Sequence, residues 1–259
     1  MKILLLLCSF LSLSTMAKIK TETVEYKEGE TVLEGYVAYP KKMTKKTPVV
    51  ILVHEWTGLG DFVKERAQEL ARRGYIAFGA DIYGKGVRPS TPEEAGKTAG
   101  IYKSNRALLR KRAEAALTYV STLKNVDSEK IVAAGFCFGG TTALEMGRAG
   151  QKLAGIVSFH GGLGADNTTD AKNIQGQVLV LHGAVDPYVS ETELKTFEKE
   201  MNDNKVDWRM VKYANAVHSF TNKAAGNDNS KGAAYNELAD KRSMVDFMAF
   251  LNEVAPLKK

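Results

Sequence analysis

The sequence predicts an α/β fold with a mainly parallel central sheet and helices on both of its faces. Two observations support this prediction. Five short segments are apolar almost throughout, as expected for strands buried on both faces of a parallel sheet. Amphipathic helical patterns lie between and after these segments, and such alternation of strands and helices covers both faces of the sheet.

The expected strands begin with an extended segment of alternating polarity at 21–39. The last strand is expected at 208–213. The buried strands lie between them, at 49–53, 75–78, 131–134, 155–159 and 178–181. Ligands of open parallel sheets bind beyond the carboxyl ends of the strands, so the residues that follow these segments are the candidates for a functional site.

The expected helices show apolar residues at a spacing of three or four. Such stripes pack into a core far more often than they bind partners. A further helix is expected at 141–148, directly after a buried strand, and Gly74 follows the first stripe where a helix cap is common. The stripes are Val63, Ala67, Leu70 and Ala71; Leu109, Ala113, Ala116, Leu117 and Val120; and Met244, Phe247, Met248 and Leu251.

The composition is that of a globular protein, with 44% hydrophobic and 25% charged residues among 259. The formal net charge is +6, but the lysines are scattered. The cluster at 41–46 contains no interleaved aromatic residues, so it indicates a solvated loop and no nucleic-acid partner.

The first 17 residues have the pattern of a signal peptide. Lys2 precedes an apolar run at 3–13, and small residues precede the Ala17–Lys18 bond. The run is shorter than the roughly 20 residues that span a bilayer. We therefore expect export to the periplasm or the medium after cleavage near Ala17, which leaves 18–259 as a single domain without a membrane span. The alternative is an uncleaved anchor.

Cysteine usage directs attention to one residue. Cys8 lies in the expected signal peptide, so the mature chain keeps Cys137 alone. A single thiol forms no internal disulfide, and exported proteins usually pair or avoid cysteine. Cys137 is either a buried, inert residue or a reactive thiol.

The surroundings of Cys137 favour the reactive thiol. A buried strand at 131–134 runs into the pattern Gly-x-Cys-x-Gly at 135–139, and a helical segment follows. This is the nucleophile-elbow pattern with cysteine in place of serine. Gly135 and Gly139 lack the side chains that would collide across so sharp a turn, and the helix N-terminus favours a thiolate at Cys137.

An acid and a base follow the elbow in the chain order that this arrangement requires. Asp186 lies just past the strand at 178–181, and His218 lies beyond the strand at 208–213. His218 can deprotonate Cys137, while Asp186 orients the ring and supports its charged form. Asp81 also follows a strand, but it precedes the nucleophile and is expected to be structural.

Three other histidines are weaker candidates for the base. His182 lies too close to the strand that positions Asp186. His160 ends a strand and either lines the pocket or is a satisfied loop residue. His54 precedes the loop in which the second amide of an oxyanion hole is expected.

With these features in place, the chain resembles the dienelactone hydrolase family of the α/β-hydrolase superfamily from about Thr23 to Leu251. The motifs are specific only in combination. They are His54-Glu55-Trp56-Thr57-Gly58, Asp81-Ile82-Tyr83, Gly135-Phe136-Cys137-Phe138-Gly139-Gly140, Gly183-Ala184-Val185-Asp186 and His218-Ser219-Phe220.

The resemblance implies an α/β-hydrolase fold with a triad of Cys137, Asp186 and His218. It also implies an oxyanion hole formed by the backbone amides of Phe138 and Trp56. The glutamate that matches Glu55 contacts the resting cysteine in the family and gates its activation. From the sequence alone, Glu55 could equally be a loop carboxylate.

The chain departs from the family at the residues that hold an anionic substrate. The best-known members use two arginines, whose positions are taken here by Lys85 and Asn222. Lysine lacks the paired donors of arginine, which puts a carboxylate-bearing substrate in doubt. The aromatic residues near the motifs are candidates to line an apolar pocket instead, and the alternative for several of them is packing in the core: Trp56, Tyr83, Phe136, Phe138 and Tyr188.

These observations predict hydrolysis of a small-molecule carboxylic ester or lactone through a thioester on Cys137. No cofactor is required by this chemistry, and no metal-ligand spacing occurs in the sequence. The alternatives are a cysteine acyltransferase or peptidase, and a ligand-binding protein whose triad is inactive. The sequence does not indicate the oligomeric state.

Overall fold

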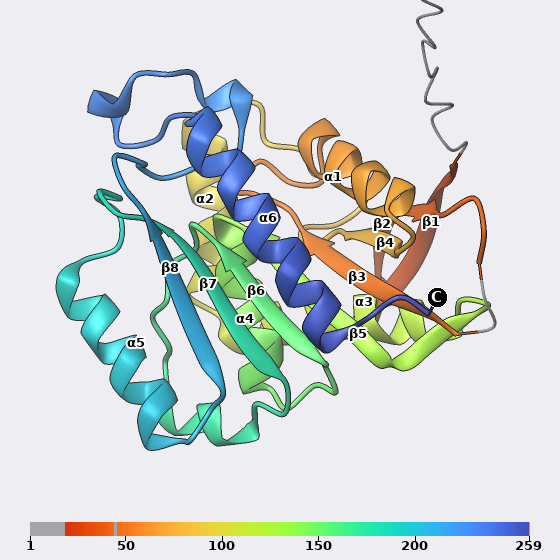
Figure 1. Cartoon of the computed structure of the whole chain (residues 1–259). Coiled ribbons are helices and arrows are strands. Elements are labelled where there is room, and N and C mark those ends of the chain that lie inside the picture. Colours follow the sequence, from red (N-terminus) through yellow and green to blue (C-terminus); the bar gives the residue numbers. More distant parts are fainter. Residues whose placement is uncertain (1–18, 44–45, 259) are drawn as a thin grey trace, which may run out of the picture.

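The computed structural model describes residues 19–43 and 46–258, so the expected signal peptide at 1–17 lies outside the described residues (Figure 1). Eight strands form one sheet in the order β1-β2-β4-β3-β5-β6-β7-β8. The strands from β4 to β8 pair in parallel, whereas β1 with β2, and β2 with β4, pair antiparallel. The predicted α/β fold with a mainly parallel sheet is confirmed.

Each strand predicted from the sequence is present. The alternating segment at 21–39 forms two strands joined by a tight turn at Gly29, whose φ is +53°. The strands are β1 (Lys20–Glu28), β2 (Thr31–Tyr39), β3 (Thr47–Val53), β4 (Ile76–Ala80), β5 (Val126–Phe136), β6 (Gly155–Phe159), β7 (Gln177–Gly183) and β8 (Trp208–Tyr213).

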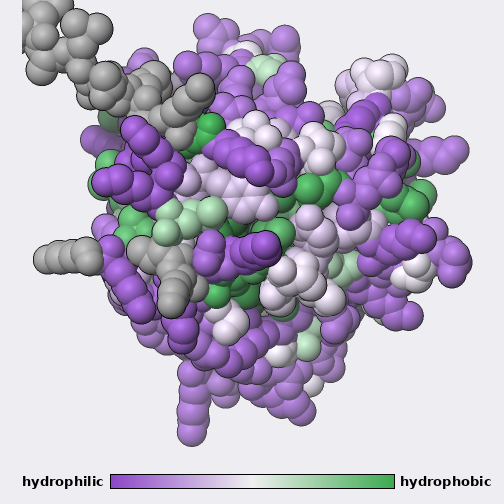
Figure 2. Space-filling view, turned by 90° about the vertical axis from the view of Figure 1, so that its right-hand side faces the viewer, coloured by the Kyte–Doolittle hydropathy of each residue, from purple (hydrophilic) through white to green (hydrophobic). Residues whose placement is uncertain are grey.

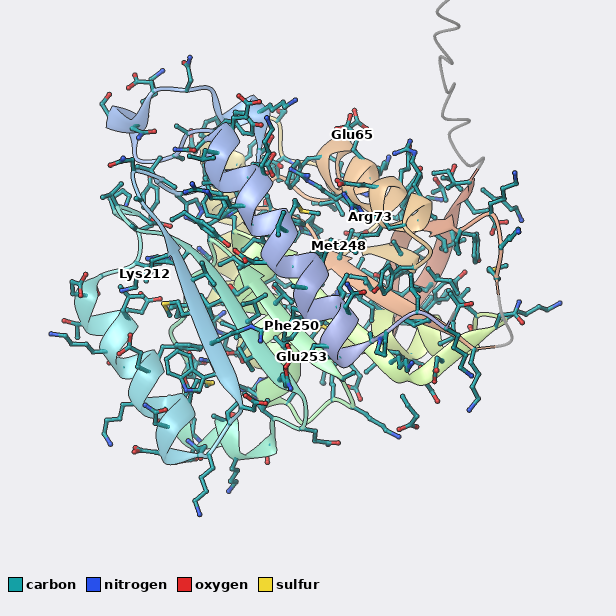
Figure 3. The ribbon with its side chains drawn as sticks, viewed as in Figure 1. Glu65, Arg73, Lys212, Met248, Phe250 and Glu253 are labelled. Atoms are coloured by element: carbon teal, nitrogen blue, oxygen red, sulfur yellow. The ribbon has the colours of Figure 1, made fainter. Side chains whose placement is uncertain are left out.

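Helices cover both faces of the sheet (Figure 1). On one face, α1 (Asp61–Arg72) and α6 (Glu237–Val254) pack against the core, and Figure 3 shows Phe250 of α6, which is buried there. On the other face lie α3 (Arg106–Thr122), α4 (Phe138–Arg148) and α5 (Glu191–Asp203), with α2 (Pro92–Lys103) beside α3. Short 3₁₀ helices occur at Thr168–Asn173, Lys223–Ala225 and Asn229–Lys231.

The sequence patterns did not predict α2 and α5. Helix α5 buries Leu194, Phe197 and Met201 within a segment that is otherwise strongly charged. Helix α2 buries mainly small residues, so its apolar stripe is narrow. Both helices begin at a side-chain cap, in which the hydroxyl of Thr91 or Ser190 accepts a hydrogen bond from the backbone amide three residues later.

The turn from β5 into α4 is as sharp as the elbow pattern predicted. Cys137 has φ of 54° and ψ of −114°, a backbone conformation that strains any residue other than glycine. A Cβ atom on Gly135 would lie 1.9 Å from the carbonyl oxygen of Gly139, and one on Gly139 would lie 2.2 Å from the carbonyl oxygen of Val53. The two glycines therefore allow α4 to begin directly against the ends of β5 and β3.

The far end of α4 is held by a buried ionic network. The guanidinium of Arg148 is fully buried and donates to both carboxylate oxygens of Glu200 in α5, at 2.8 and 2.7 Å. It also donates to Glu145, at 3.1 Å, and to the carbonyl oxygen of Leu163, at 2.8 Å. The network joins α4 to α5 and to the loop after β6, so it fixes the helix whose first turn carries the functional site.

The face of the molecule drawn in Figure 2 is dominated by hydrophilic side chains. Apolar groups occur there in small areas between charged residues. In the part of the chain that the structure describes, no helix is long and apolar enough to cross a membrane.

We expect Glu200→Gln to lower the free energy of unfolding by about 3 kcal/mol, because it leaves the buried charge of Arg148 without its bidentate partner. Lys199→Ala is the matched control, since Lys199 pairs with Asp203 at the surface of the same helix. Its effect should stay below about 1 kcal/mol. Urea unfolding measures both values, and equal effects would contradict the role of the buried network.

The strain at Cys137 predicts that Cys137→Gly is more stable than Cys137→Ala by about 1 kcal/mol. The strained backbone costs about 1–3 kcal/mol with any side chain, and this exceeds the roughly 0.5–1 kcal/mol that glycine loses in chain entropy. Urea unfolding of the two variants gives the difference. A glycine variant no more stable than the alanine variant would show that the turn stores no strain.

Candidate active site

The candidate residues lie beyond the carboxyl ends of six neighbouring strands, β3 to β8, where the parallel sheet places its ligands. Cys137 follows β5 directly and forms the cap of α4. Its backbone amide donates to the carbonyl oxygen of Phe159, at 3.0 Å, and to Nδ1 of His160, at 3.2 Å. These bonds join the elbow to the end of β6.

His218 interacts with both Asp186 and Cys137. Its Nδ1 is 2.9 Å from Oδ2 of Asp186, and the Cys137 side chain is close enough to its ring to raise the pKa of the imidazole. Asp186 is itself oriented by the amide of Tyr188, which donates to Oδ1 at 2.9 Å. The structure therefore brings together the three residues of the predicted triad in the order acid, base and thiol.

The electrostatics of this group favour a charged imidazole. Burial alone would lower the pKa of His218, but the hydrogen bonds to Asp186 and Cys137 outweigh it and raise the pKa to about 10. His218 would therefore hold a proton taken from Cys137 strongly while the carboxylate of Asp186 is ionised. Such an arrangement can supply a nucleophilic thiolate and a general acid for the leaving group.

His160 is a buried, satisfied histidine and not a residue that lines the pocket. Its Nδ1 accepts from the amide of Cys137, so its Nε2 carries the proton and donates to Oγ1 of Thr221 at 2.8 Å. Burial, followed by the charge of His218, holds the pKa of His160 well below its usual range. The neutral ring connects the elbow to the segment after His218.

Glu55 contacts the segment that follows His218 and is almost fully buried. Its carboxylate accepts from Oγ of Ser219, at 3.2 Å, and from Nδ2 of Asn222. Burial raises the pKa of Glu55, although Asn222, His218 and Ser219 act in the opposite direction. The contact of Glu55 with the resting thiol, expected from the family resemblance, stays a prediction.

The two predicted oxyanion amides belong to peptide groups whose carbonyl oxygens accept hydrogen bonds from other backbone amides. The carbonyl oxygen of Cys137, in the peptide that carries the Phe138 amide, accepts from the amides of Gly140 and Thr141 at 3.0 and 3.4 Å. The carbonyl oxygen of Glu55, in the peptide that carries the Trp56 amide, accepts from the amide of Gly58 at 3.2 Å.

The aromatic candidates fall into different environments. Tyr83 is buried beside Phe138, with ring centroids 5.3 Å apart, and its hydroxyl donates to the carbonyl oxygen of Trp56 at 3.0 Å. Tyr188 is exposed and its ring lies 5.2 Å from that of His218. Phe136, a candidate for the pocket or for the core, is buried in the core on the α1 and α6 face, stacked on Phe159.

The structure does not bring Lys85 into this group. Its ammonium pairs with Glu25 of β1, at 2.5 Å, and both side chains are about half exposed. Asn222, at the second position where the family resemblance places an arginine, is uncharged and bonded to Glu55. Ser219 and Thr221 were missed as site residues. Ser219 belongs to the motif that begins at His218, whereas the only sequence signal for Thr221 was its nearness to His218.

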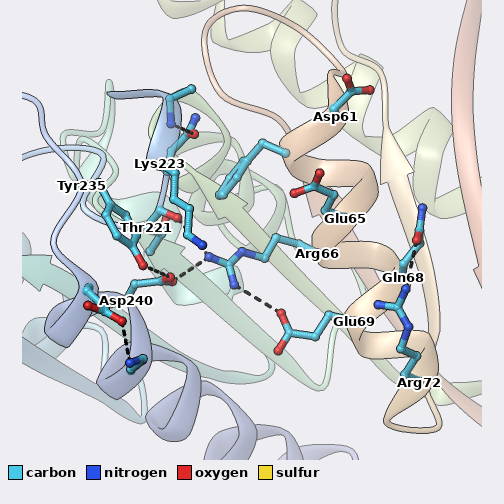
Figure 4. Close-up of a pocket in the computed structure, with 15 residues that line it drawn as sticks. Asp61, Glu65, Arg66, Gln68, Glu69, Arg72, Thr221, Lys223, Tyr235 and Asp240 are labelled. Carbon is cyan, nitrogen blue, oxygen red and sulfur yellow. Dashed lines mark hydrogen bonds and ion pairs between the residues drawn. The ribbon is translucent and has the colours of Figure 1, made fainter. Parts of the chain in front are cut away.

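A cavity of about 730 Å³ lies next to the site, between α1 and the start of α6 (Figure 4). Thr221 and Asn222 line it, but Cys137, Asp186 and His218 do not. Arg66 lines it and donates to Asp240 and to the carbonyl oxygen of Thr221, at 2.6 and 3.0 Å. No group of three or more potential metal ligands occurs among the residues that the structure describes.

The raised pKa of His218 predicts a pH-dependent contribution to folding stability. The ordinary pKa is 6.5 and the folded value about 10, so the folded protein holds an extra proton between them. The contribution is therefore complete below about pH 6.5 and is lost as the pH rises towards about 10. Urea unfolding at several pH values should show a smaller alkaline loss for Asp186→Asn. Identical losses would refute this account.

Comparison with known proteins agrees with this geometry. Residues 33–255 match the model of the dienelactone hydrolase family. A protein of Aquifex aeolicus named as a carboxymethylenebutenolidase is 26% identical over 205 residues, which cover 78% of this chain and 87% of that protein. Two solved structures are each 38% identical and cover 91% of this chain and 98% of their own.

One of these structures is named m3DLH and superposes with a TM-score of 0.88. The other is a dienelactone hydrolase-like promiscuous phosphotriesterase from metagenomic libraries, with a TM-score of 0.87. The family match covers most of the chain, and the sheet order and elbow agree with it. The chain therefore belongs to the dienelactone hydrolase family, with the α/β-hydrolase fold, and is a hydrolase of the ester- and lactone-cleaving kind.

Proposed function

We propose that this protein hydrolyses uncharged carboxylic esters or lactones through a thioester on Cys137. One observation carries the proposal. The ring of His218 lies 2.9 Å from Asp186 and interacts with the side chain of Cys137, which stands at a strained turn that begins a helix. A thiol so placed is supported as a thiolate by a cationic ring and by the helix N-terminus.

In the first half of the reaction, the thiolate of Cys137 attacks the carbonyl carbon of the substrate. A carbon–sulfur bond forms, and the electron pair of the carbonyl moves to its oxygen, which the amides of Phe138 and Trp56 stabilise by about 3–4 kcal/mol each. The carbonyl re-forms as the carbon–oxygen bond to the alcohol breaks. The leaving oxygen takes the proton of His218, and a thioester remains.

In the second half, the neutral His218 removes a proton from a water molecule as that water attacks the thioester. The carbon–sulfur bond breaks, the carboxylic acid is released, and the thiolate of Cys137 returns beside the protonated ring. Asp186 keeps its charge throughout and stabilises the cationic state of His218. All the acid and base steps therefore use one histidine.

The charges around the site support an uncharged substrate. Lys85 is paired with Glu25, and Arg66 is committed to Glu69, Asp240 and a backbone carbonyl. Asn222 and Glu55 offer no positive charge to a substrate carboxylate. The similarity to a promiscuous phosphotriesterase is consistent with this, because a phosphotriester also carries no charge.

We further propose that residues 18–259 act as one exported domain after cleavage near Ala17.

The test compares two esters of similar size, 4-nitrophenyl butyrate and mono-4-nitrophenyl succinate, with product release and intact mass followed together. We expect turnover of the butyrate with a transient acyl adduct, and a loss of about a thousandfold or more in Cys137→Ala. The charged succinate should react at least about tenfold more slowly. Lys85→Ala is the control and should change neither rate.

Other outcomes would replace the proposal. A folded protein with no turnover above Cys137→Ala would indicate a ligand-binding role. Faster transfer to an added alcohol than to water would indicate an acyltransferase, and faster cleavage of matched amides than of esters a peptidase. Preferred turnover of the succinate, reduced in Lys85→Ala, would contradict the choice of an uncharged substrate.

A further inference from the structure

His54 is a fully buried histidine that the proposed reaction leaves without a role. It follows β3 directly and precedes the segment that carries the Trp56 amide. Its ring nitrogens both contact backbone groups, in contrast to those of His218. Nδ1 lies 2.6 Å from the carbonyl oxygen of Glu55, and Nε2 lies 3.2 Å from the amide nitrogen of Ile82.

These partners determine where the proton of the ring lies. The amide of Ile82 can only donate, so Nε2 of His54 must accept. The carbonyl oxygen of Glu55 can only accept, so Nδ1 carries the hydrogen and donates it. Burial lowers the pKa of His54 to about 4, so the ring is neutral at ordinary pH and this single tautomer satisfies both bonds.

The bond to Glu55 determines the direction of a different group. The carbonyl of Glu55 and the N–H of Trp56 belong to one planar trans peptide, in which they point in opposite directions. His54 and the amide of Gly58 both donate to that carbonyl oxygen, at 2.6 and 3.2 Å. They hold the plane of the peptide and polarise it, which makes the Trp56 N–H a better donor.

The ring itself is fixed by aromatic neighbours. Tyr83 meets it edge to face with centroids 4.7 Å apart, and Phe138 stacks on it at 5.7 Å and 15°. Phe138 carries the other predicted oxyanion amide. The hydroxyl of Tyr83 donates to the carbonyl oxygen of Trp56, at 3.0 Å, which holds the next peptide of the same loop.

We propose that His54 is a positioning residue for the oxyanion hole: its Nδ1–H bond to the Glu55 carbonyl aims the Trp56 amide at the oxygen of the reacting carbonyl. This inference rests on the proposed function, since an oxyanion forms only if Cys137 attacks a carbonyl group. His54 does not touch the substrate or exchange a proton with it.

Two variants separate the two nitrogens of the ring. The amide nitrogen of asparagine can take the place of Nδ1, so His54→Asn keeps a donor for the Glu55 carbonyl and loses the acceptor for Ile82. The longer glutamine reaches the position of Nε2, so His54→Gln keeps an acceptor for Ile82 and loses the donor. A purely structural role of the buried ring predicts similar losses in both.

The experiment measures three quantities in the wild type and in both variants: kcat/KM for 4-nitrophenyl butyrate, the rate at which iodoacetamide alkylates Cys137, and the urea unfolding midpoint. Alkylation displaces iodide and forms no oxyanion. Its rate therefore reports the reactivity of the Cys137 thiolate, with any effect of Glu55 on it, and not the oxyanion hole. We expect His54→Gln to lower kcat/KM about tenfold, less than the roughly hundredfold loss of a whole oxyanion donor. Alkylation should stay within about twofold, and His54→Asn should retain most of kcat/KM.

The outcomes separate this inference from the proposed function. If the wild type shows no turnover that depends on Cys137, the proposed function fails and the role of His54 falls with it. If the wild type turns over and both variants lose equal activity, or if alkylation falls in proportion to kcat/KM, only the positioning role is overturned. Loss of folding in His54→Gln but not in His54→Asn would also overturn it, because the donor would then be structural.

Discussion

The site depends on one constraint, the sharp backbone turn at Cys137 between β5 and α4. The turn holds only because Gly139 lets the first turn of α4 approach the carbonyl oxygens of Val53 and His54, at 2.2 and 2.7 Å from the position of a hypothetical Cβ. This approach brings the amide of Phe138 beside the loop after β3, which carries the amide of Trp56. A strained residue thus assembles groups from two strands that are neighbours in the sheet but about eighty residues apart in the chain.

Among the histidines beyond the strand ends, His54 and His160 are neutral and His218 favours the charged form, because their hydrogen-bond partners differ. His54 and His160 are buried, each has its proton on one defined nitrogen, and burial favours their neutral forms. His218 is also largely buried, but the carboxylate of Asp186 and the thiol of Cys137 reverse the effect of burial on its pKa. Neutral rings suit a scaffold of fixed bonds, whereas a ring that carries a proton suits the chemistry proposed for Cys137.

Much of this arrangement could be predicted from local patterns. Period-two and continuous apolar runs located the strands, although β1 and β2 were predicted as one extended segment. The glycines around Cys137 indicated the elbow. These signals reflect the geometry of a few consecutive residues. Helices α2 and α5 were missed because their apolar stripes are narrow within charged segments. For Phe136 the sequence left a pocket or a core position open, because a residue beside the nucleophile can face either side of the sheet, and it faces the core under α1 and α6.

The order of residues in the chain predicted the chemistry that we propose: a cysteine at a strand-to-helix turn, then an aspartate and a histidine after later strands. Only the tertiary structure decided how the surrounding polar residues are paired. Lys85 pairs with Glu25, sixty residues away, and Glu55 bonds with Ser219 and Asn222 across more than 160 residues. Turn and strand signals depend on neighbours in the chain, whereas the partner of a charged side chain depends on which strands the sheet places side by side.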